Sequence, residues 1–333
     1  MYEWILDFLL IRVDELYAAK SDGEILGGYI KSSNRIYRIY HGVPIIYPTI
    51  LHRHLRKVIS AYRRIPPNTW RASRSDWFRH LRRQQAELII HGLGYLIGSR
   101  NIKKLNILSV GCGSGWELWL IREYLQRIST NIRFRAVGID ISLKALFEAK
   151  IVSKALSARN IDFICAPAEF LPFKDAIFDV VLAVFGALDH SIIFPRAFKE
   201  ISRVLRPNGI FIGTVLNKFA LDWIFKVLSS FSLFVKTLRY ANRPFAKIRV
   251  PIRQGYVRIP THFYTIFELD NLLRKNSLRL IYLKGIFSTL PMDFKSKRFS
   301  ILHKFLAGVD YKFSSAPILR SVGRYIGFIA EKI

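Results

Sequence analysis

Residues 105–115 read Leu-Asn-Ile-Leu-Ser-Val-Gly-Cys-Gly-Ser-Gly, and this stretch decides the fold. A run of strand-forming residues ends in glycines at three alternate positions, Gly111, Gly113 and Gly115, and a helix-like segment follows at 116–127. Glycine permits the backbone angles of a tight strand-to-helix turn, and it has no Cβ to keep a ligand away. The first N–H groups of the helix can then bind a polar group. The stretch predicts a nucleotide-like ligand, although glycine-rich turns also serve packing.

Strands and helices alternate downstream of this turn. We expect strands at 134–140, 161–165, 178–185 and 210–216, a helix at 196–205 and a turn at 206–209. The segment 178–185 is almost continuously apolar, as in a strand that is buried on both faces. The second strand ends in Asp140, where a carboxylate accepts hydrogen bonds from ribose hydroxyl groups. The pattern predicts an α/β fold with a doubly wound parallel sheet.

Four segments in order resemble the class I S-adenosylmethionine-dependent methyltransferases, in particular the type 11, small-molecule group. They are 107–115, 138–142, 171–181 and 200–209. The resemblance covers residues 104–216. It implies a Rossmann-like sheet of seven strands with an antiparallel last hairpin, methyltransferase activity, and S-adenosylmethionine as cofactor.

The resemblance also implies a cofactor site. The glycine turn would hold the methionine end, Asp140 the ribose, and Ile141 would pack on the adenine, with Ala168 and Glu169 along the adenine edge. The full set of cofactor-binding candidates is Ser109, Gly111, Cys112, Gly113, Gly115, Asp140, Ile141, Ala168, Glu169 and Phe185.

Two positions depart from the family pattern. Ser109 stands where an Asp or Glu is usual. Pro167 stands where an Asp often contacts the adenine amino group, and proline offers neither a side-chain acceptor nor an N–H. Because a fold does not guarantee its chemistry, a catalytically silent binding protein stays open as an alternative.

The chain divides into three parts by sequence. We expect a small β module at 1–50, a helical cap or linker at 51–100 that is interrupted at 66–67, and the methyltransferase domain at 101–333, with basic helical insertions at 217–260 and 287–323. The module contains a predicted hairpin at 27–48 with its turn at 32–34. Its segment 37–44 resembles the end of zinc-ribbon-like modules that partner some methyltransferases, but it lacks their cysteines. A structural cap and a recruitment module both remain open.

Flanking segments add further candidates for the acceptor site. Trp77, Phe78 and His80 lie in the predicted helical cap, either in a substrate pocket or in the core. The amphipathic segment 217–249 is either a lid on the active site or a helix in a membrane interface. A late helix at 261–276 and two last strands at 278–286 and 324–332 complete the expected domain.

Positive charge is concentrated outside the expected cofactor domain. The net charge is +28, yet residues 101–210 carry 15 Lys and Arg against 10 Asp and Glu. Residues 53–83 carry 10 basic residues and one acid, and residues 223–267 carry eight and none. Such segments attract the phosphates of nucleic acid or of anionic lipid, or they form a solvated surface without a dedicated partner.

Cysteine and hydropathy predict a cytoplasmic protein, with contact to an anionic membrane surface as an open alternative. The chain has two cysteines, Cys112 and Cys165, too few for a disulfide framework or a zinc cluster, and we expect both to be buried. The first residues lack a basic leader, and no apolar run approaches the ~20 residues that span a bilayer. The histidines are not paired with acids at ligand spacing, so we expect no metal site.

Catalytic candidates are few because methyl transfer from a sulfonium mainly requires alignment and exclusion of water. Asp189 and His190 follow the fourth strand, and His190 is the candidate base with Asp189 orienting it, or it contacts the acceptor or packs without taking a proton. His262 and Tyr264 are weaker pocket candidates.

The acceptor is left open between two classes. The amphipathic insertion, 14% aromatic residues and the type 11 resemblance favour a lipid-like or isoprenoid-like small molecule. The net charge of +28 and the N-terminal hairpin favour RNA, such as tRNA. The oligomeric state does not follow from the sequence.

Overall fold

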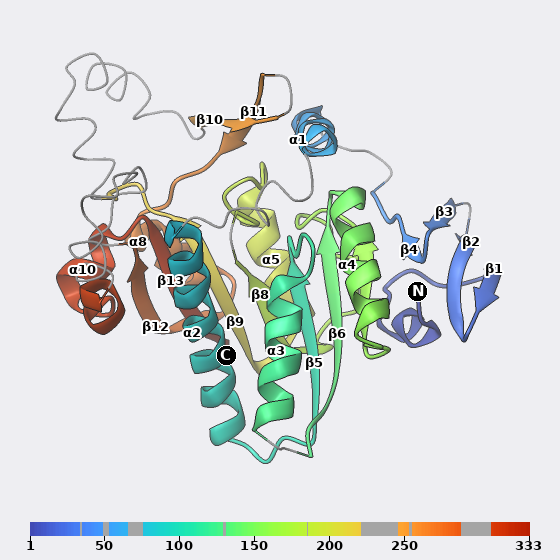
Figure 1. Ribbon diagram of the computed structural model, residues 1–333, viewed down its shortest axis with the longest axis horizontal. Coiled ribbons are helices and arrows are strands. Elements are labelled where there is room, and N and C mark those ends of the chain that lie inside the picture. The colour runs from blue at the N-terminus through green and yellow to red at the C-terminus, as the bar shows by residue number, and fades with distance from the viewer. Residues whose placement is uncertain are drawn as a thin grey trace.

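A central sheet of seven strands organises the computed structural model (Figure 1). The structure describes residues 1–33, 35–48, 53–65, 76–128, 131–184, 186–220, 246–252, 255–287 and 308–333. The strand order is β12-β13-β9-β8-β5-β6-β7. The strands are β5 (Lys104–Val110), β6 (Arg133–Asp140), β7 (Ile161–Cys165), β8 (Phe178–Ala183), β9 (Leu205–Leu216), β12 (Leu278–Ile286) and β13 (Tyr325–Lys332). The five strands β5 to β9 are parallel, and β13 is antiparallel to both β9 and β12, as the family resemblance implied.

Helices cover both faces of this sheet. Helices α2 (Asp76–Gly98), α3 (Trp116–Arg127) and α4 (Leu143–Ala155) lie side by side in front of it in Figure 1. Helices α5 (Phe194–Val204) and α8 (Ile266–Lys275) pack on the opposite face. Side chains alternate along each strand, so that Ile107 joins the core beneath α2 and α3 while Leu108 joins the core beneath α5. Both faces are therefore apolar, which explains the continuous apolar runs in the sequence.

The turn expected at 206–209 lies within the bounds of β9. Phe178 of β8 pairs with Leu205, and Val180 pairs with Ile210, so residues 206–209 bulge out of the ladder. Asn208 adopts a left-handed backbone (φ 62°) within this bulge. The turn chemistry was predicted correctly, and the difference is that the strand begins before it.

The N-terminal part is a four-stranded antiparallel sheet with the order β1-β2-β3-β4. It comprises the 3-10 helix η1 (Glu3–Phe8), β1 (Glu15–Ser21), β2 (Glu24–Ser32), β3 (Arg35–Tyr40) and β4 (Val43–Pro44). The predicted hairpin corresponds to β2 and β3, whereas β1 was not expected. The chain after β4 reaches the edge of the central sheet, where the Ile46 N–H donates to the Cys165 carbonyl at 2.9 Å. This contact covers the edge of β7, which would otherwise offer unpaired backbone groups.

A buried ion-pair network also joins the N-terminal sheet to the central domain. Lys150 of α4 pairs with Glu24 of β2 and, at 3.1 Å, with Asp162 of β7. All three side chains are at most 8% exposed, so each charge depends on its partners. The apolar side chains of η1 belong to the same core as those of β8 and α5.

Two further segments lie at the top of the view in Figure 1. Helix α1 (Arg53–Arg64) packs through Ala61 against a two-stranded antiparallel sheet, β10 (Ala246–Pro251) and β11 (Tyr256–Thr261). The insertion 217–260 was expected to be helical; the described part at 246–251 is a strand instead, and residues 221–245 lie outside the described residues. Residues 288–307 of the second insertion also lie outside them, and the described remainder is helical at 308–313 and in α10 (Pro317–Val322).

Candidate functional site

The glycine turn forms the floor of a cavity. Gly111, Gly113 and Gly115 all adopt left-handed backbone angles, with φ of 70°, 53° and 78°. The Cys112 N–H donates to the Ile139 carbonyl at 2.9 Å and so ties the turn to β6. A Cβ on Gly113 would meet nothing within 4 Å, so its backbone faces open space. This is the unobstructed backbone surface that a cofactor requires.

The other two glycines act through packing. A Cβ on Gly111 would come within 2.6 Å of the Ala187 Cβ, so a side chain there would push the loop after β8 away. Gly115 is the N-cap of α3, and its Cα faces Trp119 and Phe163, where a Cβ would be 3.2–3.3 Å from their rings. Gly115 is not part of the cavity lining, in contrast to Gly111, Cys112 and Gly113.

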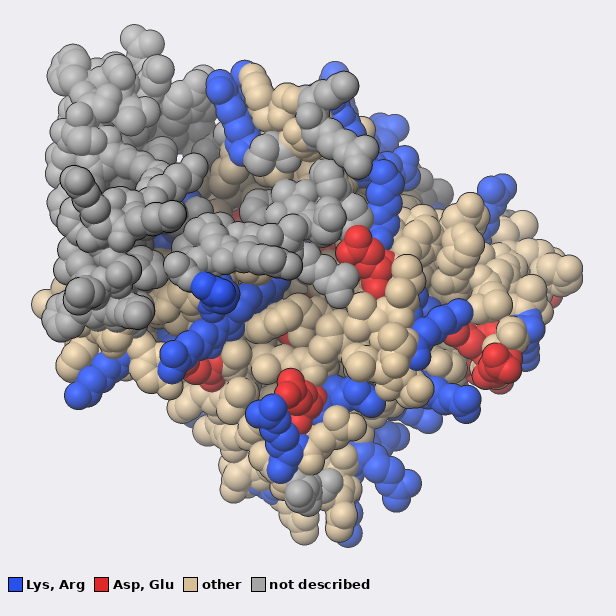
Figure 2. Space-filling model, viewed as in Figure 1, with Lys and Arg blue, Asp and Glu red and all other residues tan. Residues whose placement is uncertain are grey.

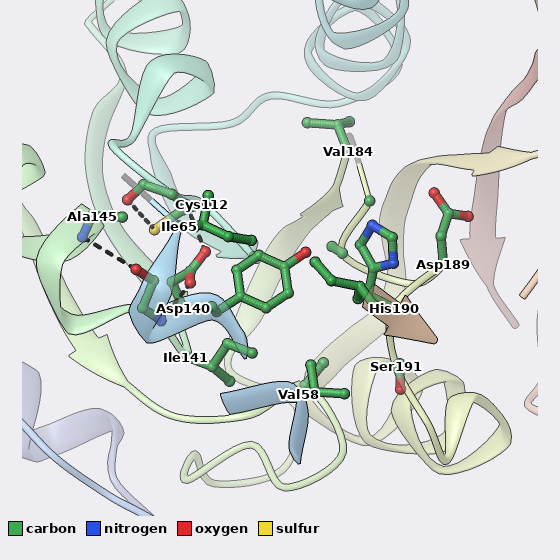
Figure 3. A pocket seen from close by; sticks show the side chains of 18 of the residues that line it. Val58, Ile65, Cys112, Asp140, Ile141, Ala145, Val184, Asp189, His190 and Ser191 are labelled. Carbon is green, nitrogen blue, oxygen red and sulfur yellow. Dashed lines mark hydrogen bonds between the residues drawn. The ribbon is translucent and has the colours of Figure 1, made fainter. Parts of the chain in front are cut away.

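Asp140 ends β6 and faces the cavity. Its carboxylate accepts hydrogen bonds from the Gly113 N–H at 2.8 Å and the Ser142 N–H at 2.7 Å. Burial raises the pKa of Asp140, and these backbone donors oppose that rise. The carboxylate thus holds the glycine turn in place and keeps lone pairs for a further donor. Figure 3 places Asp140 and His190 on opposite sides of the cavity, with Ile141 and Val58 along its wall.

The segment after β7 closes the cavity beside Ile141. Ala166, Ala168 and Glu169 belong to its lining. The carboxylate of Glu169 is occupied, because it accepts from the Ser191 hydroxyl at 2.7 Å and the Ile192 N–H at 3.0 Å. Glu169 therefore braces the loop after β8. Phe185, the remaining candidate of this group, lies outside the described residues.

Ser109 does not reach the cavity, and its hydroxyl donates to the carboxylate of Glu117 on α3. Glu117 is only 4% exposed and lines the cavity next to Trp116. Burial raises the pKa of Glu117, opposed by the Ser109 hydrogen bond and the positive charge of Arg82. Sequence reasoning missed both Glu117 and Arg82. The sequence signal for Glu117 is Ser109 itself: the family resemblance implies an acid at that position, and its absence points to an acid elsewhere in the site.

The cavity has a volume of about 530 Å³, within the range of small-molecule sites. It extends from the glycine turn to an apolar region beneath α1 and β10–β11. The apolar side chains of that region are Leu55, Val58 and Ile65 from the α1 segment and Ile248, Val250 and Ile259 from the two strands. Polar groups are few there, and they include the Tyr62 phenol and the His190 imidazole.

His190 is not oriented by Asp189, so the expected pair is not formed. The Nδ1 atom of His190 lies 3.1 Å from the Thr261 hydroxyl and 3.3 Å from the Pro260 carbonyl. Because the Thr261 hydroxyl donates to the Ile259 carbonyl, Nδ1 carries the proton and Nε2 is the acceptor. Burial lowers the pKa of His190 to about 4, so the ring is neutral at pH 7. A neutral imidazole of this kind accepts a hydrogen bond but is a weak base.

The Asp189 carboxylate is hydrogen-bonded to the backbone instead of to His190. It is fully buried, and its Oδ1 accepts from the Leu216 N–H of β9 at 2.8 Å. Burial raises the pKa of Asp189 to about 7. Its Oδ2 has no hydrogen-bond partner among the described residues, and the residue lines the cavity. Asp189 therefore titrates near neutrality beside the site.

The weaker candidates separate into core and cavity residues. His262 stacks on Phe194 at 4.1 Å and contacts Glu268 through Nε2 at 2.8 Å, and Tyr264 is fully buried. Neither lines the cavity, because both pack between α5 and α8. Phe78 does line it, whereas His80 faces Asp310 at 3.4 Å, and the Trp77 side chain lies outside the described residues.

S-adenosylmethionine fits this arrangement. The open backbone at Gly113, the half-buried carboxylate of Asp140 and the apolar side chain of Ile141 all line the cavity. Among the described residues, no group of three or more His, Cys, Asp or Glu could hold a metal ion. No helix in the described part of the chain is long and apolar enough to cross a membrane.

Comparison with known proteins shows which family the chain resembles. A family described as a methyltransferase domain matches residues 108–213. An uncharacterized protein of Methanocaldococcus jannaschii is 32% identical over 228 residues, which is 68% of this chain and 76% of that protein. A ubiquinone biosynthesis O-methyltransferase of Pelagibacter ubique is 28% identical over 210 residues, 63% of this chain and 76% of that enzyme. The crystal structure of the PH0226 protein from Pyrococcus horikoshii superimposes with a TM-score of 0.47 at 16% identity, over 82% of this chain and 98% of that one.

Proposed function

We propose a function for a chain that belongs to the class I S-adenosylmethionine-dependent methyltransferases: it methylates a small apolar acceptor in the cavity beneath α1 and β10–β11. One observation carries the proposal. The space over the glycine turn continues, without a break in the lining, into the apolar region made by α1, β10 and β11. A relative named for ubiquinone biosynthesis is consistent with an acceptor of this class.

Three residues hold the parts of the cofactor in turn. Gly113 leaves room for the methionine end, Asp140 accepts from the ribose hydroxyl groups, and Ile141 packs on the adenine. Gly111 keeps the loop after β8 close to the turn. Ala168 lies along the adenine edge, where Pro167 offers no polar contact of its own. Cys112, a buried thiol, fills space beneath the turn, and Gly115 shapes the start of α3.

The acceptor end aligns the nucleophile and excludes water. When bound, S-adenosylmethionine supplies a methyl group on a sulfonium, which the nucleophile takes in line. The Nε2 atom of His190 accepts a hydrogen bond from a hydroxyl or N–H of the acceptor and orients it. The buried Asp189, whose pKa is near 7, is the group beside the site that can take a proton at neutral pH. The apolar side chains of α1 and β10–β11 keep the region dry.

RNA is the second candidate, and one observation favours it. The outward face of α1 is strongly basic and the helix contains no acid. Its exposed basic residues are Arg53, Arg56, Lys57, Arg63 and Arg64. Figure 2 shows that Lys and Arg side chains outnumber Asp and Glu on this side of the molecule. Such a surface attracts phosphates, with an affinity that falls steeply as salt rises. An acceptor buried in the apolar region would depend little on salt.

The test is methyl transfer from radiolabelled S-adenosylmethionine into a methyl-deficient extract of the source organism, followed by separation of organic, RNA and protein fractions. Label in the organic fraction supports the proposed acceptor class, and label in RNA supports the second candidate. Label in neither fraction, with cofactor binding intact, contradicts both and points to a catalytically silent binding protein.

A pair of matched variants assigns the label to this site. Gly113→Arg fills the open space over the turn and should abolish cofactor binding and labelling. Gly94→Arg adds the same side chain at an exposed position of α2 with nothing within 4 Å of its Cβ, and it should leave both unchanged. Cofactor binding by Gly113→Arg at the parental affinity would place the pocket elsewhere.

A further inference from the structure

A carboxylate and a guanidinium line the same cavity beside the glycine turn. Glu117 and Arg82 both line the cavity, together with Ser114 and Trp116. Glu117 lies in the first turn of α3, where the helix dipole favours a carboxylate. Arg82 comes from α2, with its guanidinium carbon 4.3 Å from the centre of the Trp116 ring and 5.0 Å from that of Phe78. The two charges are close enough to affect each other's pKa.

Both side chains are held in place by groups behind them. The Ser109 hydroxyl at the end of β5 donates to Glu117 and fixes its carboxylate. The Arg82 guanidinium lies near two aromatic rings and donates to Gln85 Oε1 at 3.3 Å. Such preorganisation is expected of side chains that bind a charged ligand rather than solvent. A buried carboxylate and a half-buried guanidinium that line the same cavity form the complement of a zwitterion.

We propose that Arg82 and Glu117 bind the amino-acid end of the cofactor, Arg82 its carboxylate and Glu117 its ammonium. Ser109 is a positioning residue that acts through Glu117. Glu117 on the following helix thus stands in for the acid that the family resemblance implies at position 109. The inference rests on the proposed cofactor pocket, and it adds the residues that discriminate the amino-acid end.

Binding of cofactor fragments tests this pair directly. The probes are S-adenosylhomocysteine, its decarboxylated analogue, its deaminated analogue and 5′-methylthioadenosine, which lacks the amino-acid end. Calorimetry on the parental chain should show S-adenosylhomocysteine bound about tenfold to a hundredfold tighter than either analogue, because each loses one charge-assisted contact. Equal affinity for the four probes would overturn the proposal while leaving the pocket intact. Absence of binding by all four would instead overturn the proposed pocket.

Two variants then assign each charge. Arg82→Gln should weaken S-adenosylhomocysteine about tenfold or more and leave the decarboxylated analogue unchanged. Glu117→Gln should weaken S-adenosylhomocysteine to a similar degree and leave the deaminated analogue unchanged. Neither variant should alter 5′-methylthioadenosine. An equal loss for 5′-methylthioadenosine would overturn the assignment, because it would show a structural effect on the whole pocket.

Matched controls and a variant of Ser109 complete the design. Arg83→Gln removes the neighbouring arginine, whose side chain is 67% exposed, and Glu123→Gln removes an acid of α3 that is 60% exposed. Both should bind every probe as the parent does. Ser109→Ala removes the hydroxyl that positions Glu117 and should weaken the decarboxylated analogue while 5′-methylthioadenosine binds as before. An equal loss for 5′-methylthioadenosine would contradict a positioning role for Ser109.

Discussion

Burial shifts the pKa values of two adjacent side chains at the site in opposite directions. Asp189 is raised to a pKa of about 7 and His190 is lowered to about 4, because burial disfavours the charged form of each. At pH 7 the imidazole is neutral and the carboxyl is half ionised. The two residues were expected to act as a hydrogen-bonded pair. The Asp189 carboxylate accepts from the Leu216 N–H instead, because β9 passes beside Asp189 and the backbone donor of Leu216 needs a partner.

Asp189→Asn should therefore stabilise the protein at alkaline pH. Asp189 has a folded pKa of about 7, above the ordinary value of 3.8, so the unfolded state loses its proton first as pH rises. Stability is lost between pH 4 and pH 7, and asparagine removes that loss while it still accepts from the Leu216 N–H. The advantage of the variant should grow by about 3 kcal/mol between pH 5 and pH 8 in urea titrations. The titration of His190 contributes equally to the free energy of unfolding of both proteins, so it cancels in the comparison.

The control is Asp175→Asn, which removes a carboxylate that is 72% exposed. The difference in free energy of unfolding between this variant and the parent should not grow from pH 5 to pH 8. An Asp189→Asn protein that is less stable at pH 8 than at pH 5, relative to the parent, would show that the carboxylate is ionised favourably in the folded state.

At the scale of the element, α1 has two different faces. Its inward face carries Leu55, Val58 and Tyr62 into the cavity, and its outward face is basic. Its sequence contains no acid, so neighbouring cations repel one another and the helix depends on packing against β10–β11. We infer that α1 closes the acceptor region, and that the cap expected for 51–100 includes this lid.

Val58→Phe should impair use of the acceptor without affecting the cofactor. Val58 is 1% exposed and faces the apolar region, so a larger ring occupies space that the acceptor needs. We expect kcat/KM for the acceptor to fall about tenfold, and calorimetric affinity for S-adenosylhomocysteine to change less than twofold. Ser60→Phe, on the exposed face of the same helix, is the matched control. Unchanged kinetics in Val58→Phe would move the acceptor away from α1.

Much of the element pattern follows from the sequence, and the exceptions have local causes. Helix 116–127 and the strands 161–165 and 278–286 coincide with the predicted ranges, because period and flanking residues mark them clearly. The strands β10 and β11 were not expected, because their short basic sequences resemble a surface loop and are stabilised by packing on α1. Glu117 was missed for another reason: its role depends on a contact with Ser109 across a turn, which periodicity does not show.

At the scale of the whole molecule, the N-terminal sheet and the central domain share one apolar core. Phe8 of η1 packs edge-on against Phe178 of β8, with ring centres 5.6 Å apart. Lys150 joins the two parts through buried ion pairs with Glu24 and Asp162. Between a structural cap and a recruitment module, these contacts favour the cap. We propose that residues 1–50 fold with the central domain as one cooperative unit.

Phe8→Ala should therefore destabilise the whole molecule. Removing a ring that is 6% exposed from a shared core costs ~3 kcal/mol or more, because the cavity left behind collapses only in part. In urea titrations, fluorescence and loss of bound S-adenosylhomocysteine should shift together to lower denaturant concentration. Tyr17→Ala, on β1 with a ring that is 64% exposed, should leave both transitions in place. If the fluorescence transition of Phe8→Ala shifted while cofactor binding kept its parental midpoint, residues 1–50 would be an independent module. That outcome would favour recruitment, because an element that unfolds separately is free to serve a partner rather than the domain beneath it.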